Sequence, residues 1–243
     1  MLRPTEPWWQ PLVKAGCATV VQVDLSSEPA REAAALRWLD DEETARWRRA
    51  RHPRRKRQFL LCRAALRAIL CEQLGCANGD LRFVSLEHGK PGALVRARPV
   101  SASFNLTHSG DHGLIAYAPR GRLGVDVEER HCRHDPDGPI KDVFTVREQQ
   151  ELANAQGDDK IRLFFRLWTL KEAAIKALGT GFSLDPARFE IPGSMFRGHR
   201  CASFRFPHLP DVPWRLDDIG NSAFAAAVAH ETLDTSASEA GAL

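Results

Sequence analysis

Residues 123–129 read Leu-Gly-Val-Asp-Val-Glu-Glu, and the interpretation of the whole chain starts from this stretch. Apolar and polar residues alternate in it, which predicts a β-strand. Because successive side chains of a strand point to opposite faces, Asp126 and Glu128 share one face. Val125 and Val127 share the other face, which we assign to the core. Two carboxylates on one face can share a hard cation such as Mg²⁺, although a solvated acidic face would give the same pattern.

The composition indicates an ordinary globular protein. Of 243 residues, 43% are hydrophobic and 27% are charged, which suits one large domain or two small ones. The net charge is only +3, but residues 46–57 contain eight Arg or Lys. Such a cluster indicates an anionic partner, such as phosphate or an acidic protein, or else a solvated helix face.

The cysteines and the apolar runs bear on the compartment. The six cysteines include no Cys-x-x-Cys pair, and the chain shows no secretion signal. No run of about 18 apolar residues is present, so we expect no membrane span. We therefore expect a cytoplasmic protein with reduced thiols.

Helix and strand patterns alternate along the chain. Helix patterns cover 31–39, 42–51, 55–74, 146–154 and 160–178. Strand patterns cover 18–25, 80–85, 102–106, 113–117, 123–128, 188–191, 201–206, 214–216 and 223–229. Residues 89–92 predict a turn and residues 131–139 a loop. Groups of hairpin-like strands beside helices favour an α+β fold.

The helix at 160–178 carries two candidate functional residues. Glu172 and Lys176 are four residues apart and share a helix face. A surface ion pair would explain them, but Glu172 can also add a third carboxylate to Asp126 and Glu128. Lys176 would then offset negative charge on a phosphate group.

Other residues are suited to binding phosphate. Lys90 lies in a glycine-rich turn, where a ligand can approach the backbone closely. Thr107 and His108 follow the end of a predicted strand and can donate hydrogen bonds to phosphate oxygens.

Four motifs together resemble the 4′-phosphopantetheinyl transferase superfamily. In chain order they are Gly89-Lys90-Pro91, Phe104-Asn105-Leu106-Thr107-His108-Ser109, Gly124-Val125-Asp126-Val127-Glu128 and Trp168-Thr169-Leu170-Lys171-Glu172-Ala173-Ala174-Ile175-Lys176. The order and spacing resemble the Sfp-type (surfactin-synthetase-activating) group, which is monomeric, over about residues 38–182. One departure is Thr107, where a serine is more usual, and the hydroxyl group is kept.

The resemblance implies a fold and a domain division. The expected fold has two similar α+β lobes related by a pseudo-two-fold axis, each a small antiparallel sheet with helices. Coenzyme A would bind between the lobes. We place the N-terminal lobe at residues 1–119, the C-terminal lobe at 120–230 and a flexible tail at 231–243.

The resemblance also implies site residues. Asp126, Glu128 and Glu172 match Mg²⁺ ligands, and Mn²⁺ is an alternative ion. The residues that match coenzyme A contacts are Lys90, Thr107, His108, Asp126 and Lys176. Arg54 matches an arginine that binds the 3′-phosphate, with Arg63 as a second candidate.

The implied reaction transfers the 4′-phosphopantetheine arm of coenzyme A to a serine of an apo acyl or peptidyl carrier protein and releases 3′,5′-ADP. Glu172, directly or through a water, would take the serine proton, and Lys176 would lie near the phosphates. The carrier could serve fatty-acid, polyketide or non-ribosomal peptide synthesis.

The resemblance and the charge distribution together suggest how the carrier is recognised. An acidic carrier helix would suit the basic N-terminal half, and exposed apolar residues near Val143–Phe144 would help to dock it. No nucleic acid or membrane partner is expected. The alternatives are a metal-dependent nuclease, for which the arginine cluster would suit a phosphate backbone, and a non-catalytic coenzyme A-binding module.

Overall fold

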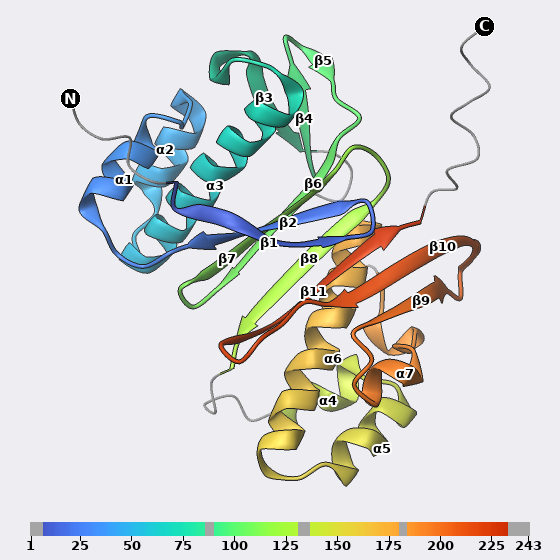
Figure 1. Cartoon of the computed structure of the whole chain (residues 1–243). Coiled ribbons are helices and arrows are strands. Elements are labelled where there is room, and N and C mark those ends of the chain that lie inside the picture. The colour runs from blue at the N-terminus through green and yellow to red at the C-terminus, as the bar shows by residue number, and fades with distance from the viewer. Residues whose placement is uncertain (1–6, 86–89, 131–136, 180–183, 233–243) are drawn as a thin grey trace, which may run out of the picture.

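The computed structural model describes residues 7–85, 90–130, 137–179 and 184–232, and it confirms the predicted α+β fold (Figure 1). The N-terminal elements are β1 (Trp9–Ala15), β2 (Ala18–Asp24), α1 (Pro29–Leu36), α2 (Asp41–Arg49), α3 (Pro53–Leu74), the 3-10 helix η1 (Asn78–Asp80), β3 (Leu81–Ser85), β4 (Pro91–Val95), β5 (Arg98–Pro99), β6 (Ser103–Ser109) and β7 (His112–Ala118). The C-terminal elements are β8 (Leu123–Glu129), α4 (Asp137–Val143), α5 (Val146–Asn154), α6 (Gly157–Leu178), the 3-10 helix η4 (Pro186–Arg188), α7 (Gly193–Phe196), β9 (Cys201–Phe206), β10 (Leu209–Asp218) and β11 (Phe224–Glu231).

The two main sheets share one connection order. The strand orders are β1-β2-β7-β6 in the first sheet and β8-β11-β10-β9 in the second, and β3-β4-β5 form a small third sheet. In the N-terminal half, β2 precedes the helices and pairs with the last strand, β7, which pairs in turn with β6. In the C-terminal half, β8 precedes the helices and pairs with the last strand, β11, which pairs in turn with β10. The same pairing order thus occurs in both halves, as expected for two similar lobes. The boundary between residues 119 and 120 stays a prediction.

The two main sheets pack face to face, with a long helix on each outer side (Figure 1). Val20 of β2 and Val125 of β8 belong to the core between the sheets, whereas the neighbouring Val21 packs toward α3. In β11, Val228 faces the inter-sheet core and Ala227 faces α6. Strand β11 is therefore buried on both faces, which explains the weak alternation of apolar and polar residues in its sequence.

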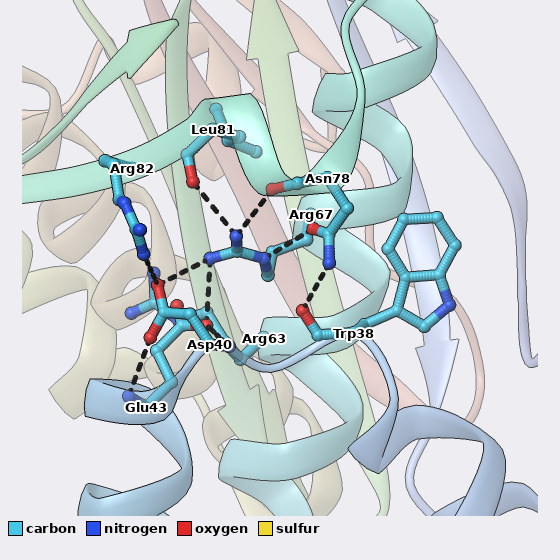
Figure 2. A network of polar contacts seen from close by, with 8 residues as sticks. All are labelled: Trp38, Asp40, Glu43, Arg63, Arg67, Asn78, Leu81 and Arg82. Atoms are coloured by element: carbon cyan, nitrogen blue, oxygen red, sulfur yellow. Dashed lines mark hydrogen bonds and ion pairs between the residues drawn. The ribbon is translucent and has the colours of Figure 1, made fainter. Parts of the chain in front are cut away.

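A network of hydrogen bonds around Arg67 fixes α2 and α3 to the small sheet (Figure 2). Arg67 is 1% exposed. Its guanidinium donates to Asp40 (3.1 Å), Glu43 (2.9 Å), the side chain and carbonyl of Asn78 (2.7 and 3.0 Å) and the carbonyl of Leu81 (3.0 Å). All five guanidinium N–H groups can be used in these bonds. Asp40 also caps α2, where its Oδ1 accepts from the Glu43 N–H (2.9 Å).

The structure corrects several boundaries and one whole element. The strand predicted at 188–191 is wrong, since η4 covers Pro186–Arg188 and residues 189–191 form no strand. Strands β1, β4 and β5 were missed, and Pro91 and Gly92 begin β4 instead of forming a turn. The loop prediction is wrong for 137–139, which begin α4, and residues 131–136 lie outside the described part.

The C-terminal strand is longer than the sequence predicts. Glu231 is the last residue of β11, and the Thr232 N–H donates to the Pro213 carbonyl (2.8 Å), so both are held in place. The rest of the predicted tail, 233–243, lies outside the described residues. Within the described residues, no helix combines the length and apolar character needed to cross a bilayer.

Candidate active site

The site begins where helix α6 crosses strand β8. Gly124 makes this close approach possible, because a Cβ there would lie 2.2 Å from the Ala173 carbonyl oxygen and 2.3 Å from the Ala177 nitrogen. Any larger residue would push the helix backbone away. Two and four residues further along the strand, Asp126 and Glu128 lie on the same strand face as Gly124. The glycine therefore sets the distance between the acidic strand and the helix that carries Glu172 and Lys176.

Asp126 is buried and only half satisfied. The residue is only 3% exposed to solvent. Its Oδ1 accepts hydrogen bonds from Lys176 Nζ (2.6 Å) and Thr107 Oγ1 (3.2 Å). Its Oδ2 is buried and has no hydrogen-bond partner within the described part of the chain. A buried, unpaired carboxylate oxygen is costly and calls for an additional partner.

A ladder of side chains from β6 runs along β8. Asn105 Oδ1 accepts from the Val125 N–H (3.0 Å), and Thr107 donates to Asp126 as above. Ser109 Oγ donates to Glu128 Oε2 (2.8 Å) and accepts from the Glu129 backbone N–H (3.1 Å). The three β6 residues are two apart, so they occupy one strand face. This ladder joins the two sheets at the site.

The three predicted metal-ligand carboxylates lie within electrostatic range of one another. Burial raises the pKa of Asp126, even though Lys176 lowers it. Burial raises the pKa of Glu128 too, with added repulsion from Asp126 and Glu172. Burial and repulsion from Asp126 likewise raise the pKa of Glu172, against attraction by Lys176. Folding has thus gathered negative charge that the protein itself neutralises only in part.

The protein side chains alone supply only some of the ligands that a divalent cation needs. No group of three or more His, Cys, Asp or Glu side chains in the described ranges forms a ready metal site. The donors are nevertheless hard oxygens of the kind that Mg²⁺ prefers, and Asp126 Oδ2 is unpaired. Mg²⁺ commonly takes one or two protein carboxylates and completes its shell with waters and phosphate oxygens. The residues therefore fit a cation that binds together with a phosphate-bearing substrate.

A basic pocket of about 460 Å³ lies beside the acidic cluster. Its basic lining residues come from α2, α3 and β6, and Phe59, Phe83 and Pro91 add apolar surface. The basic residues are Arg46, Arg49, Arg63 and His108. Three acidic residues, Asp40, Glu42 and Glu43, also line the pocket. Asp40 and Glu43 are ion-paired with Arg67, so among the described residues Glu42 is the one carboxylate of the lining left to offset Arg46 and Arg49. Arg63 Nη1 is buried without a hydrogen-bond partner within the described residues, which leaves a donor for a ligand.

His108 and Thr107 point to different parts of this region. They are consecutive in β6, so Thr107 contacts Asp126 while His108 lines the basic pocket. Burial of the ring, with the positive charges of Lys176 and Arg55, lowers the pKa of His108. A neutral imidazole can still donate one hydrogen bond to a phosphate oxygen.

Lys90 bridges the lobes at the end of α6. Its Nζ donates to the Ala177 carbonyl (2.9 Å), and its side chain crosses Gly179, where a Cβ would lie 2.8 Å from Lys90 Cδ. Gly179 ends the helix in a left-handed conformation (φ 75°). Burial lowers the pKa of Lys90 to about 8, so its charge is sensitive to nearby phosphate.

The structure separates the two candidates for the 3′-phosphate arginine. Arg63 lines the basic pocket, 3.5 Å from Glu43. Arg54 does not line it and instead lies 3.3 Å from Asp111 and 3.8 Å from Glu129. Of these two, only Arg63 faces the pocket that is suited to a phosphate.

Lys171, next to Glu172 in sequence, belongs to the core. It is fully buried and forms a 2.8 Å ion pair with Glu148, which is also fully buried. Its Nζ donates to the carbonyls of Pro186 and Phe189 (both 2.7 Å). Burial lowers the pKa of Lys171. Its contacts are all internal, so the lysine of the site is Lys176.

The docking residues expected near Val143–Phe144 need correction. Phe144 is 1% exposed and belongs to the C-terminal core, where its ring lies edge-on to Phe164. Val143 is half-buried against the same core. The exposed apolar residue of this region is Val146, at 72%.

Comparison with known proteins agrees with the geometry. Residues 122–229 match the family model of the 4′-phosphopantetheinyl transferase superfamily. Over 156 residues the chain is 30% identical to the 4′-phosphopantetheinyl transferase ffp of Bacillus subtilis, covering 64% of this chain and 67% of that protein. The chain belongs to the 4′-phosphopantetheinyl transferase superfamily.

Two further relatives refine this membership. A putative 4′-phosphopantetheinyl transferase of Synechocystis is 39% identical over 145 residues, which are 60% of this chain and 58% of that protein. The 4′-phosphopantetheinyl transferase Sfp of Bacillus subtilis is 28% identical over 161 residues, 64% of this chain and 67% of its own length. The chain thus spans less than two thirds of the Synechocystis relative. Family membership weighs against the nuclease alternative.

Sequence reasoning missed Asn105 and Ser109 as site-building residues. Both stand in the quoted motif, two positions either side of Thr107. That spacing was the available signal, because strand periodicity puts Asn105, Thr107 and Ser109 on one face. The sequence of β6 alone does not indicate that these side chains bond to β8.

Proposed function

We propose that this protein is an Sfp-type 4′-phosphopantetheinyl transferase that moves the phosphopantetheine arm of coenzyme A to a serine of an apo carrier protein and releases 3′,5′-ADP. The observation that carries the proposal is Asp126. It is buried beside Glu128, Glu172 and Lys176, with one carboxylate oxygen left unpaired.

The proposed substrate position follows from the charges. The basic pocket with Arg63 and His108 would hold the 3′-phosphate end of coenzyme A, next to Lys90. Lys176, at the junction with the acidic cluster, would face the diphosphate. Asp126, Glu128 and Glu172 would hold Mg²⁺ or Mn²⁺ together with diphosphate oxygens. When bound, that cation would neutralise charge on the phosphates.

The chain's own residues would then act as follows. Glu172, directly or through a water, would accept the proton of the carrier serine, and its raised pKa strengthens it as a base. Lys176 would stabilise negative charge on the leaving 3′,5′-ADP. Thr107 would keep the Asp126 carboxylate oriented through its hydrogen bond. The serine oxygen forms the new P–O bond as the bond to 3′,5′-ADP breaks.

The partner and the setting belong to the same proposal. Carrier domains of fatty-acid, polyketide or non-ribosomal peptide synthesis would be substrates, and the enzyme would act as a monomer. The described cysteines are free thiols, which supports a reducing compartment such as the cytoplasm.

The test is mass spectrometry of apo acyl and peptidyl carrier proteins after incubation with coenzyme A and Mg²⁺. We expect a mass gain of one phosphopantetheine arm on the carrier serine and release of 3′,5′-ADP. Asp126→Asn should lose this activity, while Glu72→Gln, an exposed carboxylate on α3, should keep it. Binding of coenzyme A with no carrier modified, across all carriers tried, would instead favour a binding module.

A further inference from the structure

A second cluster of reactive groups lies at the seam between the lobes, on the opposite side of β8 from the acidic face. Cys17, in the turn between β1 and β2, is exposed. Its Sγ lies 3.6 Å from Nδ1 of His230, which belongs to β11 and is 3% exposed. His230 pairs in register with Leu123, whose side chain packs in the inter-sheet core. Cys17 also lies outside residues 122–229 that match the family.

The other ring nitrogen of His230 faces a carboxylate. Nε2 lies 4.0 Å from Asp217 Oδ2 and has no hydrogen-bond partner within the described residues. Asp217 is buried and held by Arg215 through contacts of 2.9–3.0 Å. The order thiol, imidazole, carboxylate is the arrangement that activates a cysteine nucleophile.

A backbone carbonyl also faces the imidazole. His230 Nδ1 lies 3.2 Å from the Glu231 carbonyl oxygen as well as near Cys17. If the ring accepts the Cys17 proton at Nδ1, that N–H can donate to the carbonyl and the sulfur, and Nε2 lies on the side of Asp217.

The turn that carries Cys17 is held directly against this ring. Gly16 has φ 57°, and a Cβ at that position would lie 2.6 Å from the imidazole. Only glycine suits both the left-handed backbone and the close contact. The distance between Cys17 and His230 is thus fixed by the fold of the turn.

The neighbouring surface indicates the class of reagent. A pocket of about 370 Å³ beside the turn is lined by Lys14, Cys201 and the charged residues of β10 and its surroundings, namely Arg200, Arg215, Asp217 and Asp218. Asp217 pairs with Arg215 at 2.9 Å, and Asp218 pairs with Arg166 at 3.0 Å and more distantly with Arg200 at 3.9 Å. The lining therefore has an excess positive charge, and Lys14 contributes to it from just before the turn that carries Cys17, which does not itself line the pocket. A small molecule with carboxylates suits this pocket.

We propose that Cys17 is a reactive thiol that exchanges with small anionic disulfides, with His230 as its base and Asp217 as the residue that orients His230. The Cys17 proton moves to His230 Nδ1, and the Cys17 sulfur attacks one sulfur of the disulfide R–S–S–R. A Cys17–S–S–R bond forms, the R–S–S–R bond breaks, and the leaving thiolate takes the proton to give R–SH. Cys17 is oxidised and one R–S group is reduced.

The test measures the modification rate of each cysteine in the full chain at pH 7 with dithiobis(nitrobenzoate), an anionic aromatic disulfide, followed by peptide mass spectrometry. Cys201 is the internal control, because it is also exposed, lines the pocket itself and lies beside Arg215. The pocket alone would favour Cys201, so a faster Cys17 reaction would be due to His230. We expect Cys17 to react about ten times faster than Cys201. Equal rates in the unmodified protein would overturn the proposal, whatever the variants do.

Two variants test whether His230, and not only solvent exposure of the thiol, makes Cys17 reactive. His230→Gln should lower the Cys17 rate to about that of Cys201 and leave the Cys201 rate unchanged. Asp217→Asn should lower the Cys17 rate about threefold, since it acts through His230. Thermal unfolding of each variant identifies any that fails to fold. A folded His230→Gln protein with an unchanged Cys17 rate would overturn the role of the imidazole. The outcome is independent of transferase activity, since coenzyme A is absent from the assay.

Discussion

Two buried charged residues in this molecule, Arg67 and Asp126, have opposite surroundings. Arg67 in the N-terminal lobe has five hydrogen bonds to its guanidinium. Asp126 in the C-terminal lobe keeps one oxygen without a partner in the described residues. A buried charge that only supports the fold should be fully paired, because each unpaired group costs free energy. A buried charge left incomplete by the fold is a candidate for ligand binding.

The ion pair of Lys171 and Glu148 supports the same distinction. Glu148 accepts from Lys171, from the Thr145 N–H (2.8 Å) and from the Ile191 N–H (2.9 Å). Both partners are fully buried, and both are saturated by internal groups. Adjacent residues in one motif, Lys171 and Glu172, thus have different tasks: the first supports the fold and the second faces the site.

The largest expected effect is on Asp126. Asp126→Asn should lower the rate of carrier modification by about 1,000-fold, or about 4 kcal/mol in the activation barrier, since it removes charge from the proposed cation site. The melting temperature should stay equal or rise, because the folded protein disfavours this charge, as its raised pKa shows. Rates from mass spectrometry and melting curves check both. A variant with near-normal rate would remove Asp126 from the mechanism.

The opposite pattern is expected for Arg67. Arg67→Met should lower the free energy of unfolding by about 3 kcal/mol, because it removes the buried cation that donates to Asp40, Glu43 and the carbonyls of Asn78 and Leu81. The activity per folded molecule should hardly change. Arg82→Met is the matched control, since Arg82 contacts the same Asp40 (3.4 Å) from an exposed position. Denaturant unfolding of both variants measures the difference, and equal losses would contradict the distinction.

The close approach of α6 to β8 gives the next effect. Gly124→Ala should destabilise the fold by about 2 kcal/mol, because the new methyl group would meet the backbone of Ala173 and Ala177. It should also reduce activity by moving Glu172 away from Asp126. Gly79→Ala is the control, because a Cβ there meets nothing within 4 Å. Thermal melts and transfer rates test it, and a neutral Gly124→Ala would refute this account of the glycine.

Sequence could predict the parts of this molecule that depend on local pattern. The strand at 123–129 and the helix around Glu172 follow from periodicity, and both are confirmed. The resemblance predicted the family and the two-lobed α+β fold. The close packing behind Gly124 could not be predicted, since it depends on which helix crosses the strand.

The wrong strand at 188–191 shows why tertiary contacts defeat local pattern. Phe189 and Ile191 are buried and alternate as a strand would. Their backbone groups, however, bond to the side chains of Lys171 and Glu148, at 2.7 and 2.9 Å. A buried ion pair from two helices thus replaces the neighbouring strand as the hydrogen-bond partner. Nothing within residues 188–191 indicates this.

The smallest effect concerns the unpaired oxygen itself and depends on pH. Burial raises the pKa of Asp126, Glu128 and Glu172 above their unfolded values, so the folded protein binds these protons more tightly. The stability that these three groups contribute is therefore greatest below the unfolded pKa values, near pH 4, and is lost as pH rises through the raised ones. A divalent cation should oppose that loss, because it binds the charged forms. At about five times its dissociation constant, Mg²⁺ or Mn²⁺ should add about 1 kcal/mol at pH 7 and nothing near pH 4.

Melting curves with and without the cation at the two pH values measure this difference. Asp126→Asn should abolish the gain at pH 7, whereas Arg82→Met, which keeps all three carboxylates, should preserve it. If the cation stabilised the unmodified protein and Asp126→Asn equally, it would be bound elsewhere. The unpaired oxygen would then no longer distinguish Asp126 from Arg67 as a residue prepared for a ligand.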